Sequence, residues 1–171
     1  MLKLNLGSGD NRIDGFVSVD LYDNTADVQA DVCELPFNNN SVGEIVAYQV
    51  VEHVPYHKSQ KMFDEMYRVL SVGGTVKIET PDVDVIAKRI VDTGEISDNT
   101  IYNLVGEYYR PWDKDRYHDW ENCAAAIHRN PWNYKRVVAM GTKAGFTGFA
   151  KYKSELYPHE ENLAVCLTKY Q

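Results

Sequence analysis

The chain has 171 residues, of which 44% are hydrophobic and 25% are charged. These proportions are those of a soluble globular protein and exclude a disordered or fibrous chain. The formal net charge is −7 and no run of basic residues is longer than two, which disfavours nucleic acid as a partner. We expect residues 1–171 to form a single domain, because roughly 100 to 200 residues make one domain.

The sequence shows no sign of export or membrane insertion. Residues 1–10 lack the apolar stretch of a signal peptide, and no window approaches the roughly 18 apolar residues of a membrane span. Cys33, Cys123 and Cys166 are odd in number and widely spaced, as is typical of reduced thiols. We therefore expect a cytoplasmic protein without a membrane partner, either a monomer or a homodimer.

The first half of the chain alternates short apolar segments with turns. Apolar patterning predicts strands near residues 2–6, 16–20, 28–32 and 44–48. Residues 59–70 carry a helical apolar stripe that we expect Gly73-Gly74 to end, and residues 75–79 alternate as a fifth strand.

The second half predicts two helices and a final pair of strands. Pro81-Asp82 opens a helix to about Val91 with Asp82 as its N-cap. Asn130 before Pro131 predicts the N-cap of another helix, which Gly145 ends. Residues 149–156 and 163–168 read as an antiparallel pair. The fold class is therefore α/β, a Rossmann-like, doubly wound and mostly parallel seven-stranded sheet with a C-terminal antiparallel pair.

An aromatic-rich insertion, about residues 94–130, interrupts this pattern. Its aromatic stretch continues to residue 136, and residues 107–136 hold all three tryptophans, Trp112, Trp120 and Trp132, among tyrosines and basic residues. An insertion this long in a compact domain favours a lid over a site. Simple aromatic packing remains the alternative.

Three successive strand ends supply a glycine turn and two carboxylates. Gly7-Ser8-Gly9 follows the first strand, while Asp20 and Asp31 follow the second and third. Ligands of open α/β sheets bind at these ends, where a glycine turn lets a ligand approach the backbone. One carboxylate suits the hydroxyls of a ribose and the other suits an exocyclic amine, so we expect an adenosine ligand.

The glycine spacing limits which adenosine ligand fits. The dinucleotide motif G-x-G-x-x-G requires its third glycine where Arg12 stands, and no triphosphate-binding glycine loop is present. A ligand without phosphates fits better, and a nicotinamide-dependent oxidoreductase ranks well below the other readings.

These segments together resemble the class I S-adenosylmethionine-dependent methyltransferases, over most of the chain and in the expected order. Residues 4–9 resemble the first motif of the class, Val19-Asp20 the second, and residues 31–37 the adenine-contacting segment. Residues 44–54 are similar to the fourth-strand motif of the small, type 11-like members, and residues 66–81 to the helix, turn and strand that follow.

The chain departs from the usual pattern of the class in two ways. Asn5 replaces the usual acidic residue, and Asn11 replaces the third glycine of G-x-G-x-G. Only ten residues separate Gly9 from Asp20, so we expect the first helix to be shortened to a loop.

The resemblance implies S-adenosylmethionine as the methyl donor and S-adenosylhomocysteine as the product. In this sequence the implied cofactor-binding residues are Asn5, Gly7, Ser8, Gly9, Asp20, Leu21, Asp31, Val32, Tyr48 and Gln49. Gly7 and Gly9 would approach the methionine moiety, Asp20 the ribose, Asp31 and Val32 the adenine, and Gln49 the sulfonium.

The residues after the fourth strand are candidates for catalysis. His53 or Glu52 would take a proton from a hydroxyl or amine acceptor, although a structural role for His53 is the alternative. A substrate pocket is expected from His53, Tyr56, Tyr109, Trp112 and His118. His118, Cys123 and His128 match no zinc pattern, so no metal is expected.

The sequence leaves the methyl acceptor open. We expect a small molecule, since the aromatic stretch of residues 107–136 could stack a planar compound, a sugar face or a peptide side chain. The alternative function is a non-catalytic adenosine-binding module whose aromatic loop contacts a protein partner.

Overall fold

The computed structural model describes residues 1–106, 127–154 and 160–171 of the chain. Seven strands form one sheet in the order β3-β2-β1-β4-β5-β7-β6. They are β1 (Leu2–Leu6), β2 (Val17–Asp20), β3 (Val28–Gln29), β4 (Val42–Tyr48), β5 (Leu70–Pro81), β6 (Gly148–Lys151) and β7 (Asn162–Thr168). The described helices are the 3-10 turn η1 (Tyr56–Lys58), α1 (Ser59–Val69), α2 (Val83–Thr93), α3 (Asp98–Val105) and α5 (Tyr134–Ala144).

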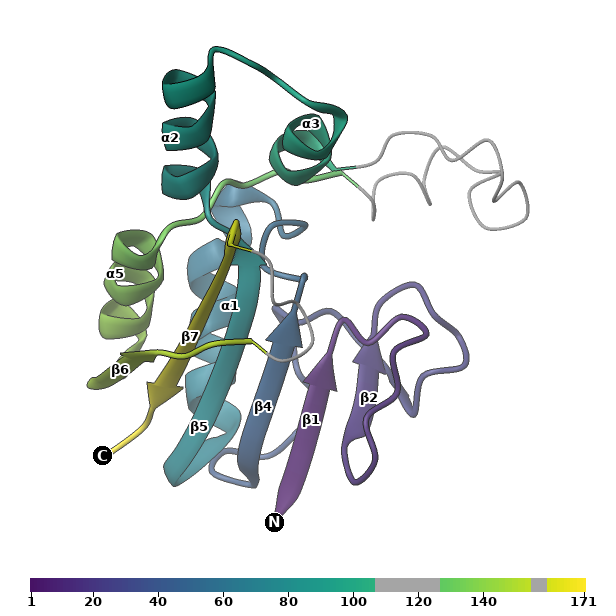
Figure 1. The fold of residues 1–171 in the computed structure, drawn as a ribbon. Coiled ribbons are helices and arrows are strands. Elements are labelled where there is room, and N and C mark those ends of the chain that lie inside the picture. The colour runs from purple at the N-terminus through teal and green to yellow at the C-terminus, as the bar shows by residue number, and fades with distance from the viewer. Residues whose placement is uncertain (107–126, 155–159) are drawn as a thin grey trace.

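The strand order reverses beside β1. This strand pairs in parallel with β2 on one side and with β4 on the other, whereas β7 runs antiparallel between β5 and β6. The carboxyl ends of β1, β2 and β4 therefore meet at one edge of the sheet, the upper edge in Figure 1. Ligands of open α/β sheets bind at such a reversal. The predicted seven-stranded, mostly parallel sheet with its C-terminal antiparallel pair is confirmed.

The hydrophobic core lies on the sheet face that α1 and α5 cover, and these two helices lie side by side in Figure 1. Alternation along β1 turns Leu4 and Leu6 into this core, where Phe63 of α1 and Val137 of α5 are also fully buried. Burying one such large apolar side chain stabilises the fold by about 1.5–3 kcal/mol. This apolar layer therefore fixes the positions of the strands, and the site lies at the ends of these strands.

The other face of the sheet carries ion pairs instead of a second apolar layer. Glu44 accepts from Lys3 at 2.9 Å and from Lys77 at 3.3 Å. Within the described ranges no helix covers this face, because residues 7–16 and 21–27 are loops. The predicted shortening of the first helix is confirmed.

Several element boundaries differ from the prediction: β3 ends at Gln29, and β5 spans Leu70–Pro81. Helix α1 ends at Val69, before Gly73-Gly74, because the backbone of Leu70 is already extended and starts β5. Asn130 is not the N-cap of α5: its side chain donates to Ser59 Oγ at 2.6 Å, and Asn133 caps the helix by accepting from the Arg136 amide at 2.9 Å. Both asparagines fit the capping pattern, and the buried contact with α1 determines their roles.

The segment from residue 94 to 130 begins with a helix that the sequence did not predict. Asp82 caps α2 as expected, and Ser97 caps the additional helix α3 by accepting from the Thr100 amide at 3.2 Å. Gly106 and Ile127 then pair as an antiparallel bridge that joins the two sides of the segment. The aromatic residues 107–126 lie outside the described residues.

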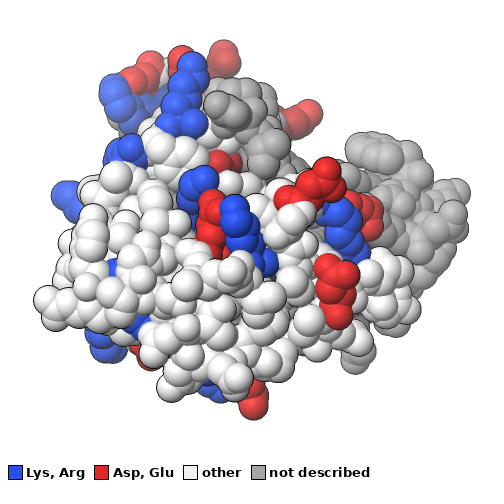
Figure 2. All heavy atoms as spheres, turned by 90° about the horizontal axis from the view of Figure 1, so that it is seen from below, with Lys and Arg blue, Asp and Glu red and all other residues white. Residues whose placement is uncertain are grey.

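The surface seen from below carries both signs of charge. Figure 2 shows acidic and basic side chains interspersed on this face, without one large basic cluster. Among the described residues, no helix has the length and apolar character needed to cross a membrane.

Candidate functional site

The turn after β1 has the backbone geometry that requires glycine. Gly7 and Gly9 have φ angles of 58° and 46°, in the left-handed region. A Cβ at Gly7 would lie 2.6 Å from Val50 Cγ2, so this glycine is also required by packing. A Cβ at Gly9 would meet no atom within 4 Å. The turn therefore presents open space on the side of Gly9.

Asn5 holds the glycine turn closed from within the sheet. It is 3% exposed, and its Nδ2 donates to the Asn11 carbonyl at 2.7 Å. The Ser8 amide donates to the Val19 carbonyl at 3.2 Å, which ties the turn to β2. Asn5 therefore shapes the turn through its donor group.

Asp20 joins the turn after β1 to the loop after β2. Its Oδ2 accepts from the Gly9 amide at 2.9 Å, and its Oδ1 accepts from the amides of Tyr22 and Asp23 at 2.8 and 2.9 Å. A carboxylate offers about four acceptor positions, so three amides leave one position for a ligand hydroxyl. Leu21, next in the chain, is exposed beside it.

Arg12 holds the same two loops together, and sequence reasoning considered it only as a missing glycine. It donates to Ser8 Oγ at 2.8 Å, to Asp23 Oδ2 at 2.6 Å and to the Gly9 carbonyl. Hydrogen bonds from Thr25, together with Arg12, lower the pKa of Asp23 to about 2. No motif marks this role, although Asp23 lies only eleven residues away.

Asp31 lies where the third strand ends, but it already has partners. Its Oδ1 accepts from the Cys33 amide at 2.8 Å and its Oδ2 from Lys58 Nζ at 3.2 Å. Partial burial raises the pKa of Asp31, but these hydrogen bonds and the Lys58 charge outweigh burial and lower it overall. Val32 is buried in the core beside it. An amine ligand at Asp31 would compete with Lys58.

The end of β4 carries backbone strain. Gln49 has a φ of 55°, which is uncommon for a residue with a side chain and concentrates at functional sites. Its amide donates to the Glu79 carbonyl at 2.8 Å, and its Nε2 donates to Asn162 Oδ1 at 2.9 Å. Tyr48 lies in register with Glu79, and burial raises the pKa of Tyr48.

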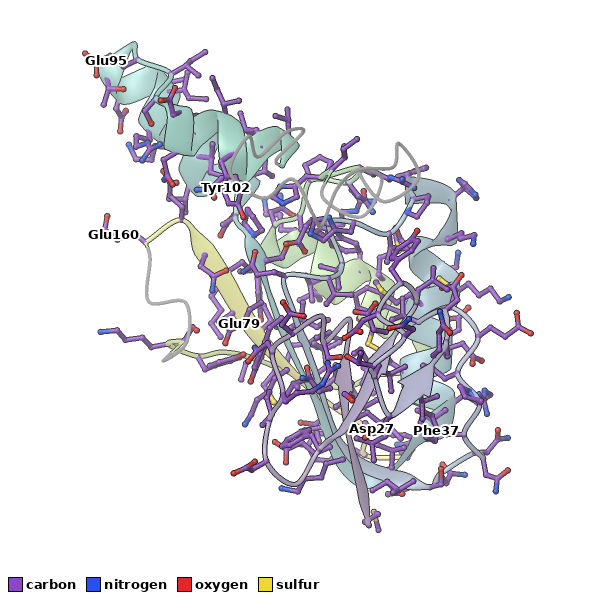
Figure 3. The ribbon with its side chains drawn as sticks, turned by 90° about the vertical axis from the view of Figure 1, so that its right-hand side faces the viewer. Asp27, Phe37, Glu79, Glu95, Tyr102 and Glu160 are labelled. Carbon is purple, nitrogen blue, oxygen red and sulfur yellow. The ribbon has the colours of Figure 1, made fainter. Side chains whose placement is uncertain are left out.

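Glu79 is a buried carboxylate that sequence reasoning missed. It is 2% exposed and accepts from Tyr152 Oη at 2.7 Å, Ser154 Oγ at 2.5 Å and Asn162 Nδ2 at 3.3 Å. Figure 3 shows that Glu79 lies nearer than Asp27 to the edge where the parallel strands end. Asp27 lies next to the amino end of β3. The donors to Glu79 are 73 to 83 residues away in the sequence, so no local pattern could have indicated this carboxylate.

Beyond the end of β4, Glu52 and His53 meet His128, which follows the insertion. Glu52 Oε2 accepts from Thr80 Oγ1 at 3.0 Å, and complete burial raises the pKa of Glu52 to about 8. His53 Nδ1 lies 3.2 Å from the Ile127 carbonyl, and burial lowers the pKa of His53 to about 4. The rings of His53 and His128 pack edge to face at 4.9 Å. Sequence reasoning named the first two residues as catalytic but did not connect them with His128.

The predicted substrate pocket is described only in part. His53 is mostly buried, whereas Tyr56 on η1 is 71% exposed with Arg136 5.3 Å from its ring centre. Tyr109, Trp112 and His118 lie outside the described residues. Trp132, one of the aromatic residues considered for the lid, is instead a core residue, 1% exposed and packed against Phe63.

The sheet order, the glycine turn and the acidic residue after β2 are those expected from the resemblance to class I methyltransferases. Consistent with this, residues 10–78 match a family described as a methyltransferase domain. No curated protein sequence matches the chain significantly.

Solved structures of methyltransferases share this fold over nearly the whole chain. A S-adenosylmethionine-dependent methyltransferase of Thermotoga maritima superposes with a TM-score of 0.62 at 12% identity, covering 98% of this chain and 82% of its own. An enzyme of the same description from Archaeoglobus fulgidus gives 0.62 at 12% identity, with 98% and 85% covered. Phosphoethanolamine N-methyltransferase 2 of Haemonchus contortus, solved with S-adenosyl-L-methionine, gives 0.57 at 16% identity, with 100% and 49% covered. The resemblance to class I S-adenosylmethionine-dependent methyltransferases is confirmed.

Proposed function

We propose that the protein transfers the sulfonium methyl group of S-adenosylmethionine to a small-molecule acceptor. The observation that carries the proposal is the position of Asp20, which bonds the Gly9 amide and retains one acceptor position at the reversal of strand order. The family match and the shared fold support the same activity.

The residues present fit an adenosyl ligand without phosphates. The open space beside Gly9 admits a ligand to the backbone of residues 7–9, and Asp20 would accept from a ribose hydroxyl. Asp31 and Val32 would contact the adenine, with Leu21 exposed at its edge. Asn5 and Ser8 would shape the turn, and Tyr48 and Gln49 would face the methyl group.

Catalysis would depend chiefly on placement. Bound S-adenosylmethionine would supply a methyl group on a positively charged sulfur, which departs as a neutral thioether. Positioning of two reactants contributes up to about 7–11 kcal/mol, and the rigid strand ends are suited to that task. His53 is proposed as the base: if its Nδ1 donates to the Ile127 carbonyl, its Nε2 carries a lone pair that can accept the acceptor's proton.

Calorimetric titration tests the cofactor. We expect S-adenosylmethionine and S-adenosylhomocysteine to bind and NAD not to bind. Asp20→Ala should weaken both adenosyl ligands strongly, whereas Asp27→Ala, whose carboxylate accepts from Ser18 and not from the glycine turn, should leave their affinity unchanged. Equal affinities in the two variants would overturn the assignment of Asp20.

Turnover is tested separately with methyl-labelled S-adenosylmethionine. Release of S-adenosylhomocysteine with one member of a panel of hydroxyl and amine compounds would support the enzyme. Tight binding without turnover on the whole panel, and in cell extract, would favour the non-catalytic adenosine-binding module instead.

A further inference from the structure

Glu52, His53 and His128 present three metal-binding atoms to one another. One nitrogen from each ring and one carboxylate oxygen all lie within 4.8 Å of one another. Three atoms so placed share a central point no farther than about 2.8 Å from each, whereas ligand distances to Zn²⁺ are about 2.0–2.2 Å. Small side-chain rotations would close the difference.

The hydrogen bonds of the two histidines leave the same nitrogen available in each ring. His53 Nδ1 lies 3.2 Å from the Ile127 carbonyl, and His128 Nδ1 lies 3.0 Å from the Asn103 carbonyl. A carbonyl only accepts, so both Nδ1 atoms carry the proton and both Nε2 atoms carry a lone pair. Metal-binding histidines are held in this way, with the second nitrogen donating to a carbonyl or carboxylate.

The carboxylate supplies an oxygen that lacks a partner. Glu52 is 2% exposed, and its Oε1 has no hydrogen-bond partner among the described residues, whereas its Oε2 is held by Thr80. An unpartnered polar atom at this depth is costly. A bound cation would satisfy it.

We propose that Glu52, His53 and His128 bind a divalent transition-metal cation. Two imidazoles and one carboxylate favour Zn²⁺, Co²⁺ or Fe²⁺ over Mg²⁺, which prefers oxygen ligands. Three protein ligands leave at least one position open, as in catalytic metal sites. A cavity of about 10 Å³ beside Glu52 and His128 is large enough for about one water molecule.

The cation would connect the segment after β4 with the segment after the insertion. Glu52 and His53 come three and four residues after Gln49 at the end of β4, whereas His128 follows the insertion. The Arg129 amide also donates to the Glu52 carbonyl at 2.8 Å, so the backbone already holds these segments together. The open position would take an oxygen of the methyl acceptor.

This last role rests on the proposed function. Bound to the cation, an acceptor hydroxyl loses its proton to solvent more readily. The oxygen then forms a bond to the methyl carbon while the carbon–sulfur bond breaks, and that electron pair remains on sulfur as the thioether of S-adenosylhomocysteine. With the cation bound, His53 is a ligand through Nε2, so the role of His53 as base applies only to the protein without the cation.

The test is a titration of the chelator-treated protein with Co²⁺, followed by visible absorption and reversed with Zn²⁺. We expect one equivalent to bind with the spectrum of a nitrogen- and oxygen-ligated ion, and Mg²⁺ in excess not to displace it. Glu52→Gln, which is nearly the same shape, and His128→Ala should lower the affinity by more than about 100-fold. His57→Ala, an exposed histidine on η1, should bind as the wild type does.

Each outcome decides the proposal. Absence of Co²⁺ binding by the wild type, or binding that Glu52→Gln and His128→Ala leave unchanged, would overturn it. Displacement by equimolar Mg²⁺ would overturn the choice of cation. Because the titration contains no S-adenosylmethionine, failure of cofactor binding would leave the metal result standing, and loss of metal binding would leave cofactor binding to be measured on its own.

Discussion

The candidate site has two halves that are built differently. The proposed cofactor half consists of the loops after β1, β2 and β3. Its glycine turn is held by contacts between residues close in sequence: Gly9 to Asp20 across 11 residues and Asn5 to Asn11 across 6. The acceptor half, beyond β4, joins Glu52 to Thr80 across 28 residues and His53 to Ile127 across 74. The first half can be recognised from short motifs, whereas the second exists only after the chain has folded.

Because the two halves are built differently, we expect them to perform different tasks. The cofactor half consists largely of backbone amides and glycines, so it fixes the shape of a ligand site. The acceptor half places titratable side chains in a buried environment, where the reactivity of each depends on its neighbours. We therefore expect substitutions in the two halves to affect different measurements.

The largest effect is expected for Glu52→Gln in the acceptor half. Methyl transfer should fall by about 100-fold or more, because the variant removes a carboxylate ligand of the proposed cation that binds the acceptor. The affinity for S-adenosylmethionine should stay within about threefold of the wild type, corresponding to less than about 0.7 kcal/mol. Labelled-methyl assays and calorimetry on one preparation measure both, and a parallel loss of affinity would show that the halves are not separate.

The next effect is expected for Gly7→Ala, compared with Gly9→Ala. Both substitutions place a side chain at positive φ, but only the Cβ at Gly7 meets Val50. We expect a loss of about 2–5 kcal/mol in the free energy of unfolding at Gly7 and about 1–2 kcal/mol at Gly9. Chemical denaturation measures both.

Gly9→Ala should affect cofactor binding more than it affects stability. Folded Gly9→Ala should still lose affinity for S-adenosylhomocysteine, because its Cβ would occupy the open space that the ligand enters. Unchanged affinity in this variant would place the ligand elsewhere.

A loss of about 10- to 100-fold in S-adenosylmethionine affinity is expected for Asp20→Asn. The amide keeps one acceptor but loses the charge, and hydrogen bonds to a charged group contribute about 1.5–3 kcal/mol. His128→Ala serves as the control from the other half and should bind the cofactor as the wild type does. Equal affinities in all three proteins would contradict the role given to Asp20.

The smallest effect is expected for Lys58→Met, which frees Asp31. The pair is largely exposed, so the free energy of unfolding should fall by less than about 1 kcal/mol. Since the pKa of Asp31 is lowered in the folded state, the contribution of the pair is complete above the ordinary aspartate pKa of about 3.9 and is lost as the pH falls through the lowered pKa. Thermal melts at neutral and acid pH should therefore differ between the two proteins only at neutral pH.

Lys58→Met should also affect the ligand in a defined direction. If adenine binds at Asp31, removal of its competitor should leave the affinity for S-adenosylhomocysteine equal or slightly higher. A marked fall in affinity would mean that Lys58 itself contacts the ligand.

The sequence was sufficient to predict the sheet and the glycine turn beside Asp20, because each rests on local patterns. Alternation along β1 and the turn Gly7-Ser8-Gly9 are contiguous, and Asp20 follows its strand directly. The sequence could not reveal that Glu79 accepts from three donors, because these donors lie 73 to 83 residues away. The contact of Arg12 with Asp23 spans only 11 residues, but it matches no motif.

Other predictions failed where tertiary packing overrode a local signal. Asn130 has the pattern of an N-cap, but it is 1% exposed and bonded to Ser59, and Asn133 takes the capping role. Trp132 belongs to the aromatic stretch from which a lid was expected, but it packs in the core against Phe63. In both cases the competing partner lies on α1, more than 60 residues earlier in the chain.

The crystal structure of the protein with S-adenosylhomocysteine tests the central claim most directly. We expect the ribose at Asp20, the adenine beside Asp31 and Val32, and the sulfur near Gln49. An adenosyl group bound away from the loops after β1, β2 and β3, with Asp20 still occupied only by backbone amides, would contradict it.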